Sequence, residues 1–165
     1  MKTFGISLTL SLLLSVSVAV MAAVSLDDTN ETSFDIGGTI TAECKVANST
    51  TNAATTLDLS SASAQNASTV YVWCNTGQNS ANTTYASLND GFLVSEEGSR
   101  IAYNINVGDQ GNNLSLATPQ TIQQLTGIGS NGDATTTDVA IIPQVSGFED
   151  SGNYNDTISV TVSYN

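Results

Sequence analysis

The sequence predicts an all-β protein that folds as an antiparallel β-sandwich. Short stretches alternate apolar and polar residues with a period of two, and clusters of Gly, Asn, Asp and Ser separate them. After the first twenty or so residues, no stretch shows the 3.6-residue period of a helix. Charged residues make up only 11% of the chain, and Ser, Thr, Asn and Gly carry most of the polarity. This composition suits strands and offers little for helices.

Residues 1–22 have the pattern of a cleaved signal peptide. Lys2 supplies the charged start, residues 6–20 are apolar or small, and residues 20–22 offer small or short side chains for cleavage. A membrane-spanning helix is disfavoured because the run is short and interrupted by serines. Cleavage leaves about 143 residues, the size of one domain, with no second apolar run of spanning length. The sequence therefore predicts an exported protein without direct membrane insertion.

The charge of the mature chain excludes several classes of partner and activity. Only Lys45 and Arg100 oppose 15 acidic residues, which gives a formal charge of −13 and argues against nucleic acid or anionic lipid. The chain has no histidine, so catalysis by a Ser–His or Cys–His pair is excluded. The acidic pairs Glu96-Glu97 and Glu149-Asp150 are interpreted as solvated surface. No enzyme activity, cofactor or metal site is predicted.

The two cysteines, Cys44 and Cys74, are predicted to form one disulfide. An even pair in an exported chain is most simply oxidised, because the compartments outside the cytosol are oxidising. In the loop-entropy model, a separation of 30 residues stabilises the fold by roughly 3.5 kcal/mol.

The start of the mature chain has an alternating pattern but few large apolar residues. An acidic lead contains Val24 and Leu26, and the side chains that share one parity after it are Phe34, Ile36, Ile40, Ala42, Cys44 and Val46. Gly37-Gly38 interrupts this row, so we predict two strand-like pieces with a flexible joint. Such a segment cannot form a core alone. It is either disordered or docks as a strand.

The middle of the chain contains six further predicted strands. Their ranges are Thr56–Leu59, Thr69–Cys74, Thr83–Leu88, Arg100–Val107, Pro119–Thr126 and Asp138–Val145. In the fourth of these, Ile101, Tyr103, Ile105 and Val107 are predicted to face inward. Residues 75–81 and 108–113 are predicted turns. Tyr71 and Trp73 are interpreted as packing between the sheets, with a carbohydrate-binding face as the alternative.

The most regular strand is predicted at the end of the sequence. Ile158, Val160, Val162 and Tyr164 alternate with small hydroxyl side chains. Exposed strand edges are normally blunted by charge, proline or a covering element. Residues 158–164 contain neither a charge nor a proline. We interpret this edge as one that receives a strand.

Four segments of the chain resemble the spore coat protein U-like pilins, the subunits of archaic chaperone–usher fimbriae. They are the alternation at Phe34 and Ile36 followed by Cys44-Lys45-Val46, the strand that ends at Cys74 and continues to Gly77, residues 98–104, and residues 152–162. The last segment is the most specific. The chain departs from the family pattern at Leu57-Asp58-Leu59-Ser60 and in its acidic lead.

The resemblance implies an immunoglobulin-like sandwich that lacks its last strand and is completed by a donor strand from another subunit. It also implies that a periplasmic chaperone fills the groove first and that the next subunit replaces the chaperone at an outer-membrane usher. Residues 23–37 would be the donor extension, with Phe34, Ile36, Ile40, Val24 and Leu26 as donor side chains. Residues 38–165 would be the pilin domain, with Ile158, Val160, Val162 and Tyr164 in the acceptor groove.

The sequence thus leads to one main interpretation and one alternative. The main one is a structural subunit of a surface fimbria, exported through the periplasm, that supports adhesion and biofilm formation. The alternative is a self-contained secreted sandwich that binds glycans or surfaces. The alternative predicts that Phe34 and Ile36 belong to an ordinary first strand of their own sandwich.

Overall fold

The computed structural model describes residues 31–127 and 132–165. The chain divides into two units, Met1–Gly38 and Thr39–Asn165. In the first unit, residues 31–38 form neither helix nor strand, and Phe34 and Ile36 are 85% and 87% exposed. The predicted signal peptide, residues 1–22, lies outside the described residues, as do Val24 and Leu26 of the predicted donor extension.

The second unit is an antiparallel β-sandwich, which confirms the predicted fold class. Its described part contains no α-helix, only the short 3-10 helix η1 (Asn52–Thr55). Its strands are β1 (Cys44–Thr50), β2 (Gln65–Cys74), β3 (Ser80–Ser87), β4 (Phe92–Ser95), β5 (Arg100–Val107), β6 (Gly111–Ser115), β7 (Gln120–Leu125), β8 (Thr135–Pro143), β9 (Tyr154–Asn155) and β10 (Ile158–Tyr164).

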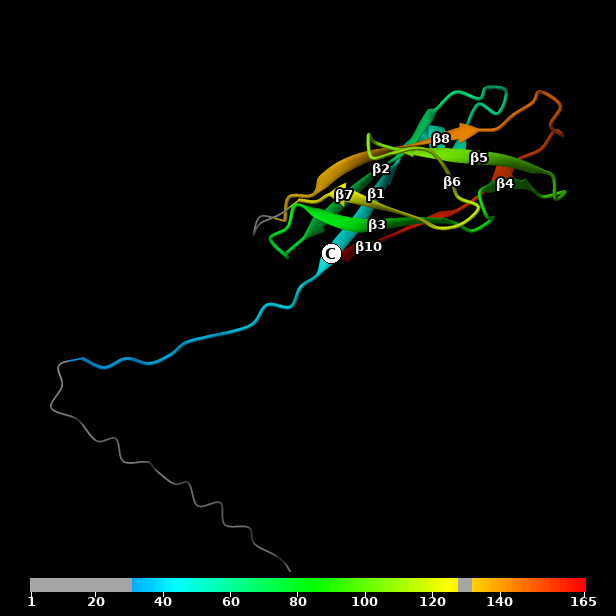
Figure 1. Ribbon diagram of the computed structural model, residues 1–165. Coiled ribbons are helices and arrows are strands. Elements are labelled where there is room, and N and C mark those ends of the chain that lie inside the picture. The colour runs from blue at the N-terminus through cyan, green and yellow to red at the C-terminus, as the bar shows by residue number, and fades with distance from the viewer. Residues whose placement is uncertain (1–30, 128–131) are drawn as a thin grey trace, which may run out of the picture. The chain divides into compact units, whose positions relative to one another are not determined.

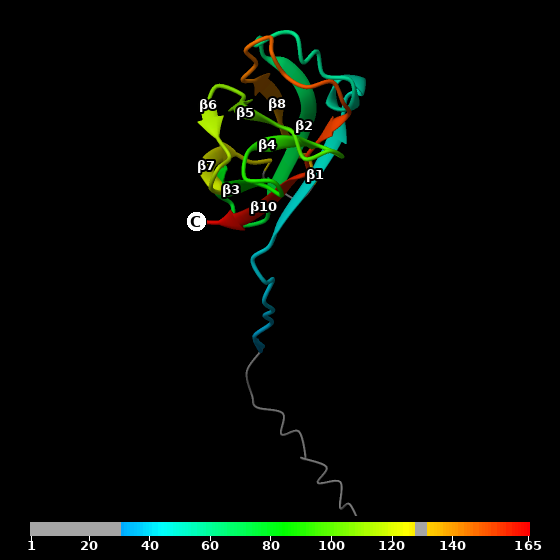
Figure 2. The ribbon, with the colours of Figure 1, turned by 90° about the vertical axis from the view of Figure 1, so that its right-hand side faces the viewer.

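The strands form two antiparallel sheets that pack face to face. The larger sheet has the order β1-β2-β8-β5-β4-β9, with β6 also paired to β5. The smaller sheet has the order β10-β3-β7. Figure 1 shows β3, β7 and β10 as one layer and β2, β5 and β8 as the other, and Figure 2 shows the same layers from the side. In this arrangement β1 and β9 are the end strands of the larger sheet, and β10 and β7 are the end strands of the smaller one.

The core between the sheets is built by alternate residues of the central strands. In β5 the four predicted inward residues are all buried, which confirms that prediction. Tyr85 of β3 contributes to the core from the smaller sheet. The buried core residues are Ala67, Val70, Val72, Tyr85, Leu93, Ile101, Tyr103, Ile105, Val107, Leu116, Val139 and Ile141. The period of two therefore reports correctly which face of β5 meets the other sheet.

The predicted disulfide between Cys44 and Cys74 is present. The two cysteines are directly opposite each other where β1 begins and β2 ends, with their Cα atoms 4.1 Å apart. The bond fixes the register of the β1–β2 pair at its first residue.

Several local predictions were wrong. The predicted strand at Thr56–Leu59 does not form: η1 ends at Thr55, and residues 56–59 lie in a loop that leads into a turn. Leu57 and Leu59 nevertheless pack against the core from this loop. The turn predicted at residues 108–113 includes the start of β6, and the turn predicted at residues 75–81 includes the start of β3.

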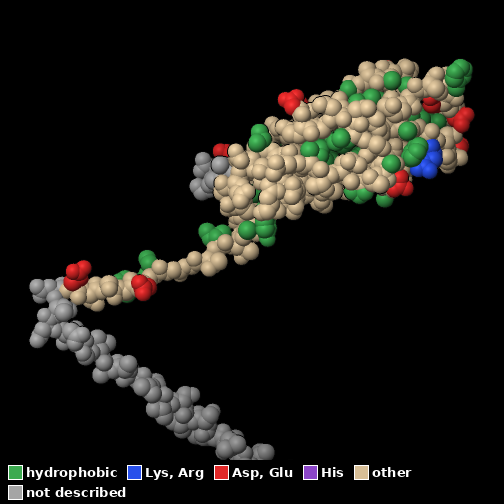
Figure 3. Space-filling view, viewed as in Figure 1, with side chains coloured by type: hydrophobic (Ala, Val, Ile, Leu, Met, Phe, Trp, Pro, Cys, Tyr) green, Lys and Arg blue, Asp and Glu red, His purple; other side chains and the backbone are tan. Residues whose placement is uncertain are grey.

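On the face shown in Figure 3, hydrophobic side chains occur in separate small areas among backbone and other side chains, and acidic side chains are scattered. In the part of the chain that the structure describes, no helix is both long enough and apolar enough to cross a membrane.

Candidate functional site

Two strand edges are left without a partner strand on the same side of the sandwich. β1 pairs along its whole length with β2, and β10 pairs along its whole length with β3. Among the described residues, neither strand has a second strand partner. Each therefore presents one row of main-chain N–H and C=O groups that no sheet ladder uses, which is the requirement for adding a strand.

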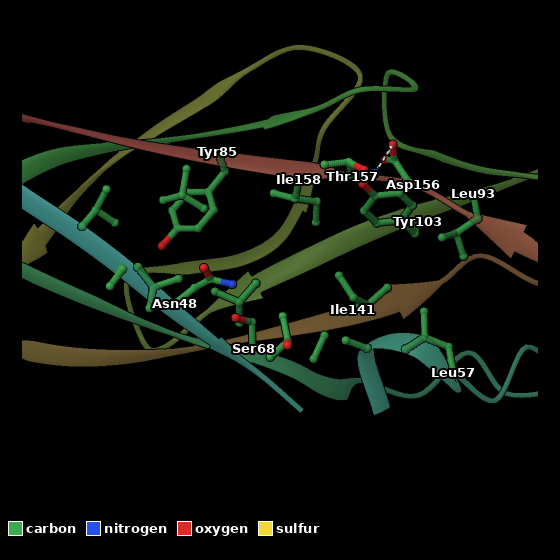
Figure 4. A pocket seen from close by; sticks show the side chains of 18 residues that line it. Asn48, Leu57, Ser68, Tyr85, Leu93, Tyr103, Ile141, Asp156, Thr157 and Ile158 are labelled. Atoms are coloured by element: carbon green, nitrogen blue, oxygen red, sulfur yellow. Dashed lines mark hydrogen bonds between the residues drawn. The ribbon is translucent and has the colours of Figure 1, made fainter. Parts of the chain in front are cut away.

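A groove with a volume of about 450 Å³ lies between these two edges. The close view in Figure 4 shows side chains from both sheets converging on it. β1 and β10 form its walls, while β2, β3, β5 and β8 supply most of its floor. Its lining residues are Val46, Ala47, Asn48, Thr50, Ala54, Leu57, Ala67, Ser68, Val70, Tyr85, Leu93, Tyr103, Val139, Ile141, Asp156, Thr157, Ile158 and Val160.

The walls of the groove are less buried than its floor. In β10, Ile158, Val160 and Val162 are only half-buried, and Tyr164 is 53% exposed. In β1 every residue after Cys44 is exposed, although all of them pair with β2. The hydrogen bonds of these two strands are thus made on one side, while their inward side chains lack a covering layer.

The two ends of the groove differ in chemistry. Leu57, Leu93 and Ile141 form an apolar end together with Ile158 and the ring of Tyr103 (Figure 4). We call this end the apolar chamber. At the other end Asn48 of β1 lies across from Tyr85 of β3 (Figure 4). We call this end the polar section.

Asp156 fixes the start of β10 at the rim of the apolar chamber. Its Oδ2 atom accepts hydrogen bonds from the Ser87 hydroxyl at 2.6 Å and the Tyr103 hydroxyl at 2.5 Å. Its Oδ1 atom accepts from the main-chain N–H groups of Asn89 at 3.1 Å and Thr157 at 2.7 Å. Burial, and to a lesser degree this hydrogen bond, raise the pKa of Tyr103, so that it remains a neutral donor. With four donors, the carboxylate is committed to holding β10 and not to binding a ligand.

The turn between β3 and β4 requires a glycine. Gly91 has a φ of +80°, and a Cβ atom there would lie 3.0 Å from the main chain of Leu116 and Ala117. Glycine is the residue that adopts this conformation without cost. The turn positions Asn89 and Ser87 for their contacts with Asp156.

The polar section is backed by a buried amide. The Tyr85 hydroxyl donates to Oε1 of Gln124 at 2.8 Å, and both side chains are fully buried. Burial raises the pKa of Tyr85 to about 12, against a smaller lowering effect of the hydrogen bond to Gln124. Within the described structure, Nε2 of Gln124 and Oγ1 of the neighbouring Thr83 have no hydrogen-bond partner. Buried polar atoms of this kind are rare in folded proteins.

Tyr71 and Trp73 do not pack between the sheets, so the preferred interpretation of these residues was wrong. They alternate with Val70, Val72 and Cys74, which are buried on the core side of β2, and they are only half-buried themselves. They line a separate hollow of about 310 Å³ beside β1. The Lys45 ammonium lies over the Trp73 ring, 5.4 Å from its centre. Because a side chain of this chain covers the ring, the hollow is a poor platform for stacking a sugar.

The acidic pair Glu149-Asp150 is a loop structure. The Glu149 carboxylate accepts hydrogen bonds from Ser146 and Gly147, and these lower its pKa to about 2. Asp150 accepts a hydrogen bond from the Ser99 hydroxyl at 2.6 Å. Both carboxylates are thus held by neighbouring polar groups within an exposed loop. A general acid needs a raised pKa, and that of Glu149 is lowered.

The structure brings together some of the site residues suggested by the sequence and adds others. Ile158 and Val160 line the groove, whereas Val162 and Tyr164 lie beyond it on the same face of β10. Phe34, Ile36 and Ile40 are exposed and lie in no strand. Sequence reasoning missed Asn48, Tyr85 and Asp156. For Asp156 the only available signal was its place directly before the alternating strand.

Comparisons with known proteins give no further guide to the groove. No protein-family model matches the chain, and no curated protein matches it.

Proposed function

We propose that this protein is a structural subunit of a surface fimbria that polymerises by strand donation. The alternating segment around Phe34 and Ile36 of one copy inserts between β1 and β10 of the next. The observation that carries this proposal is the groove of about 450 Å³ between two unpaired strand edges. The resemblance of the sequence to spore coat protein U-like pilins supports the same function.

An inserted strand satisfies both the main-chain groups and the side chains of the groove. Its N–H and C=O groups pair with β1 on one side and with β10 on the other, which joins the two sheets through a common strand. Its alternate side chains point onto the floor between Ile141, Tyr103 and Tyr85. An antiparallel β-sandwich with this groove open is therefore the acceptor half of a junction.

The donor half has the required pattern of exposed apolar residues. Phe34, Ile36 and Ile40 are each at least 85% exposed and share one parity. Fully burying a large apolar side chain stabilises a complex by about 1.5–3 kcal/mol. Two or three such side chains, together with main-chain pairing, supply enough free energy for a long-lived junction. A residue of this kind left in water has no comparable role in a self-contained sandwich.

The exposed edges indicate a need for protection before assembly. A subunit with an open groove is prone to associate with other strand edges before it reaches its partner. The resemblance to spore coat protein U-like pilins implies a periplasmic chaperone that covers the groove during export and an outer-membrane usher that exchanges this cover for the next subunit. The finished polymer would lie outside the cell, where it supports adhesion and biofilm formation.

The proposal is tested by the double variant Phe34→Asp, Ile36→Asp in cells that assemble the fimbria. Each substitution places a charge where an apolar groove must receive the side chain. Electron microscopy is expected to show no fibres, while pull-down experiments still recover the chaperone–subunit complex from the periplasm. We expect this variant to keep its fold and groove, because both residues belong to the unit Met1–Gly38 and lie in no strand.

The matched control is Asp27→Ser, Asp28→Ser, which changes the same segment without touching the predicted donor side chains and should leave fibres normal. Normal fibres from the Phe34 and Ile36 variant would place the donor elsewhere, with Val24 and Leu26 to be tested next. Assembly that survives deletion of residues 24–36 would contradict strand donation by this segment.

A further inference from the structure

The groove differs along its length, and this difference bears on which residues of a strand it accepts. The inference below rests on the proposed function and deepens it. The polar section contains Asn48 and Tyr85, and the apolar chamber contains Leu57, Leu93 and Ile141 (Figure 4). None of the residues that line the groove is a Lys or Arg. An occupant therefore meets an uncharged polar region at one end and an apolar chamber with the Asp156 carboxylate at its rim at the other.

The order of these regions is fixed by the register of β10. Val160 is paired with Tyr85 of the polar section, and Ile158 is paired with Ser87. Asp156 marks the far rim of the apolar chamber, beside Tyr103. These three positions are two residues apart, which corresponds to about 6.6–6.8 Å along a strand. A neighbouring strand therefore places one inward side chain at each of the three levels.

The polar section presents one hydrogen-bonding side chain that the isolated sandwich does not use. Nε2 of Gln124 and Oγ1 of Thr83 also lack a hydrogen-bond partner among the described residues, but both side chains are fully buried and neither lines the groove. Gln124 lies behind Tyr85, and its Oε1 atom accepts a hydrogen bond from the Tyr85 hydroxyl at 2.8 Å. In the groove itself, Asn48 presents an exposed amide. An apolar occupant would cover the Asn48 amide without giving it a partner, which is unfavourable in a dry interface.

We infer that the groove selects a strand with a small hydroxyl side chain two residues before its apolar pair, and that Thr32 is this residue. Thr32, Phe34 and Ile36 then occupy the levels of Val160, Ile158 and Asp156, respectively. The inserted strand runs antiparallel to β10. The Thr32 hydroxyl both donates and accepts, so it is able to pair with the Asn48 amide or with the Tyr85 hydroxyl.

The alternative placements fit the groove less well. If the strand ran parallel to β10, the residue beside Tyr85 would be Gly38, which has no side chain to fill the polar section. If Val24 and Leu26 entered the chamber in the parallel direction, Asp28 would face Tyr85, and its charge would be buried with no cation in the groove. In the antiparallel direction the level of Tyr85 would fall to residue 22, which the predicted cleavage removes, so no side chain would fill the polar section. Thr32-Ser33-Phe34-Asp35-Ile36 alone matches both ends of the groove.

The register is tested by photo-crosslinking. The acceptor is the mature chain with Phe34→Asp and Ile36→Asp, refolded with an excess of a peptide of residues 24–40. One peptide carries benzoylphenylalanine at position 32 and a second carries it at position 36. Mass spectrometry is expected to locate the first crosslink at Asn48, Tyr85 or Val160 and the second at Leu57, Leu93 or Tyr103. Crosslinks in the reverse order, or displaced toward Val162 and Tyr164, would overturn the inference.

The chemistry is tested by a matched pair of peptides. Thr32→Val and Thr29→Val remove the same hydroxyl at positions of opposite parity. The first is expected to weaken binding about tenfold, because the Asn48 amide is covered without a partner, and the second to change it less than twofold. On an Asn48→Leu acceptor the penalty of Thr32→Val should fall below threefold. Equal effects of the two peptides on the unaltered groove would contradict selection at Thr32.

The proposed function and the inferred register of the strand fail in different ways. If neither photoreactive peptide crosslinks and the unmodified peptide does not bind, strand donation from this segment fails and the register fails with it. If the peptide binds and crosslinks within the groove but in another register, strand donation stands and only the role of Thr32 is overturned.

Discussion

The strands β5 and β10 have almost the same sequence pattern and very different surroundings. In β5, residues Ile101, Tyr103, Ile105 and Val107 alternate with polar or small ones and are at most 3% exposed. In β10 the alternation is equally regular, yet none of its residues is buried. β5 pairs with β4, β6 and β8, whereas β10 pairs with β3 alone among the described strands.

The comparison separates two properties that a period of two is often taken to report together. Alternation decides which side chains share a face, because successive Cβ atoms point to opposite sides of a strand. Burial of that face depends on the layer that lies against it. For β10 and β1 that layer is missing over the groove. An apolar row of half-buried side chains therefore reports a face that its own sandwich leaves partly uncovered.

The largest expected effect is a difference in the free energy of unfolding between two matched Ile→Ala variants, one in β5 and one in β10. Ile105→Ala removes a fully buried side chain, so we expect it to lower the free energy of unfolding by about 2–5 kcal/mol. Ile158→Ala removes a half-buried one, and we expect a loss of about 1 kcal/mol in the isolated subunit. Urea unfolding of the two variants measures the difference.

The same two variants are also expected to differ in how strongly they weaken the junction between assembled subunits. Once a donor strand covers Ile158, its replacement should weaken the junction, whereas Ile105→Ala should act only through the stability of the subunit. Equal losses of stability for the two variants in the monomer would mean that β10 is already covered there.

The second-largest effect is expected from removal of the disulfide, because this bond anchors the β1 edge of the groove. Replacing both Cys44 and Cys74 with Ser should lower stability by roughly 3.5 kcal/mol, since the unfolded chain regains the entropy of the closed loop. Thermal unfolding of oxidised, reduced and doubly substituted protein measures this. The donor peptide should also bind less tightly to the variant, because β1 is released at its first residue. Unchanged stability on reduction would show that the bond does not constrain the fold.

The smallest effect concerns the exposed loop at Ser146–Glu149, away from both strands. The pKa of Glu149 is lowered to about 2. The hydrogen bonds of its carboxylate therefore contribute their full stability above its ordinary pKa of 4.5, and this contribution is lost as the pH falls toward 2. NMR signals of Ser146 and Gly147 should therefore keep their shifts at pH 4 and change only near pH 2. In Glu149→Gln this change should disappear. A transition centred near pH 4.5 would contradict the loop geometry.

The sequence predicted the central strands and the disulfide because their signals are local. β5 has four large apolar residues of one parity, and the chain has only two cysteines, so each has only the other as a partner. β9 has only two residues, and β6 is largely polar, so neither carries a pattern that a period of two detects. The predicted strand at Thr56–Leu59 failed because two leucines two residues apart also fit a loop that packs onto the core.

Only one wall of the groove could be predicted from the sequence. The free edge of β10 could be anticipated from Ile158 to Tyr164, which lack charge and proline. The opposite wall, with Asn48, and the floor, with Tyr85 and Ile141, depend on contacts between residues far apart in the chain. Asp156 likewise acquires its role from Ser87 and Tyr103, which are brought to it by the fold. No pattern within a short window contains this information.

The central claim is that β1 and β10 receive a strand from another copy, and amide hydrogen exchange tests it most directly. In the mature Phe34→Asp, Ile36→Asp subunit, the β10 amides that face the groove should exchange quickly, while the paired amides of β5 exchange slowly. Adding the peptide of residues 24–40 should protect those β10 amides, and those of β1 that face the groove, without changing β5. Protection of all β10 amides before the peptide is added, or no change after it binds, would contradict the claim.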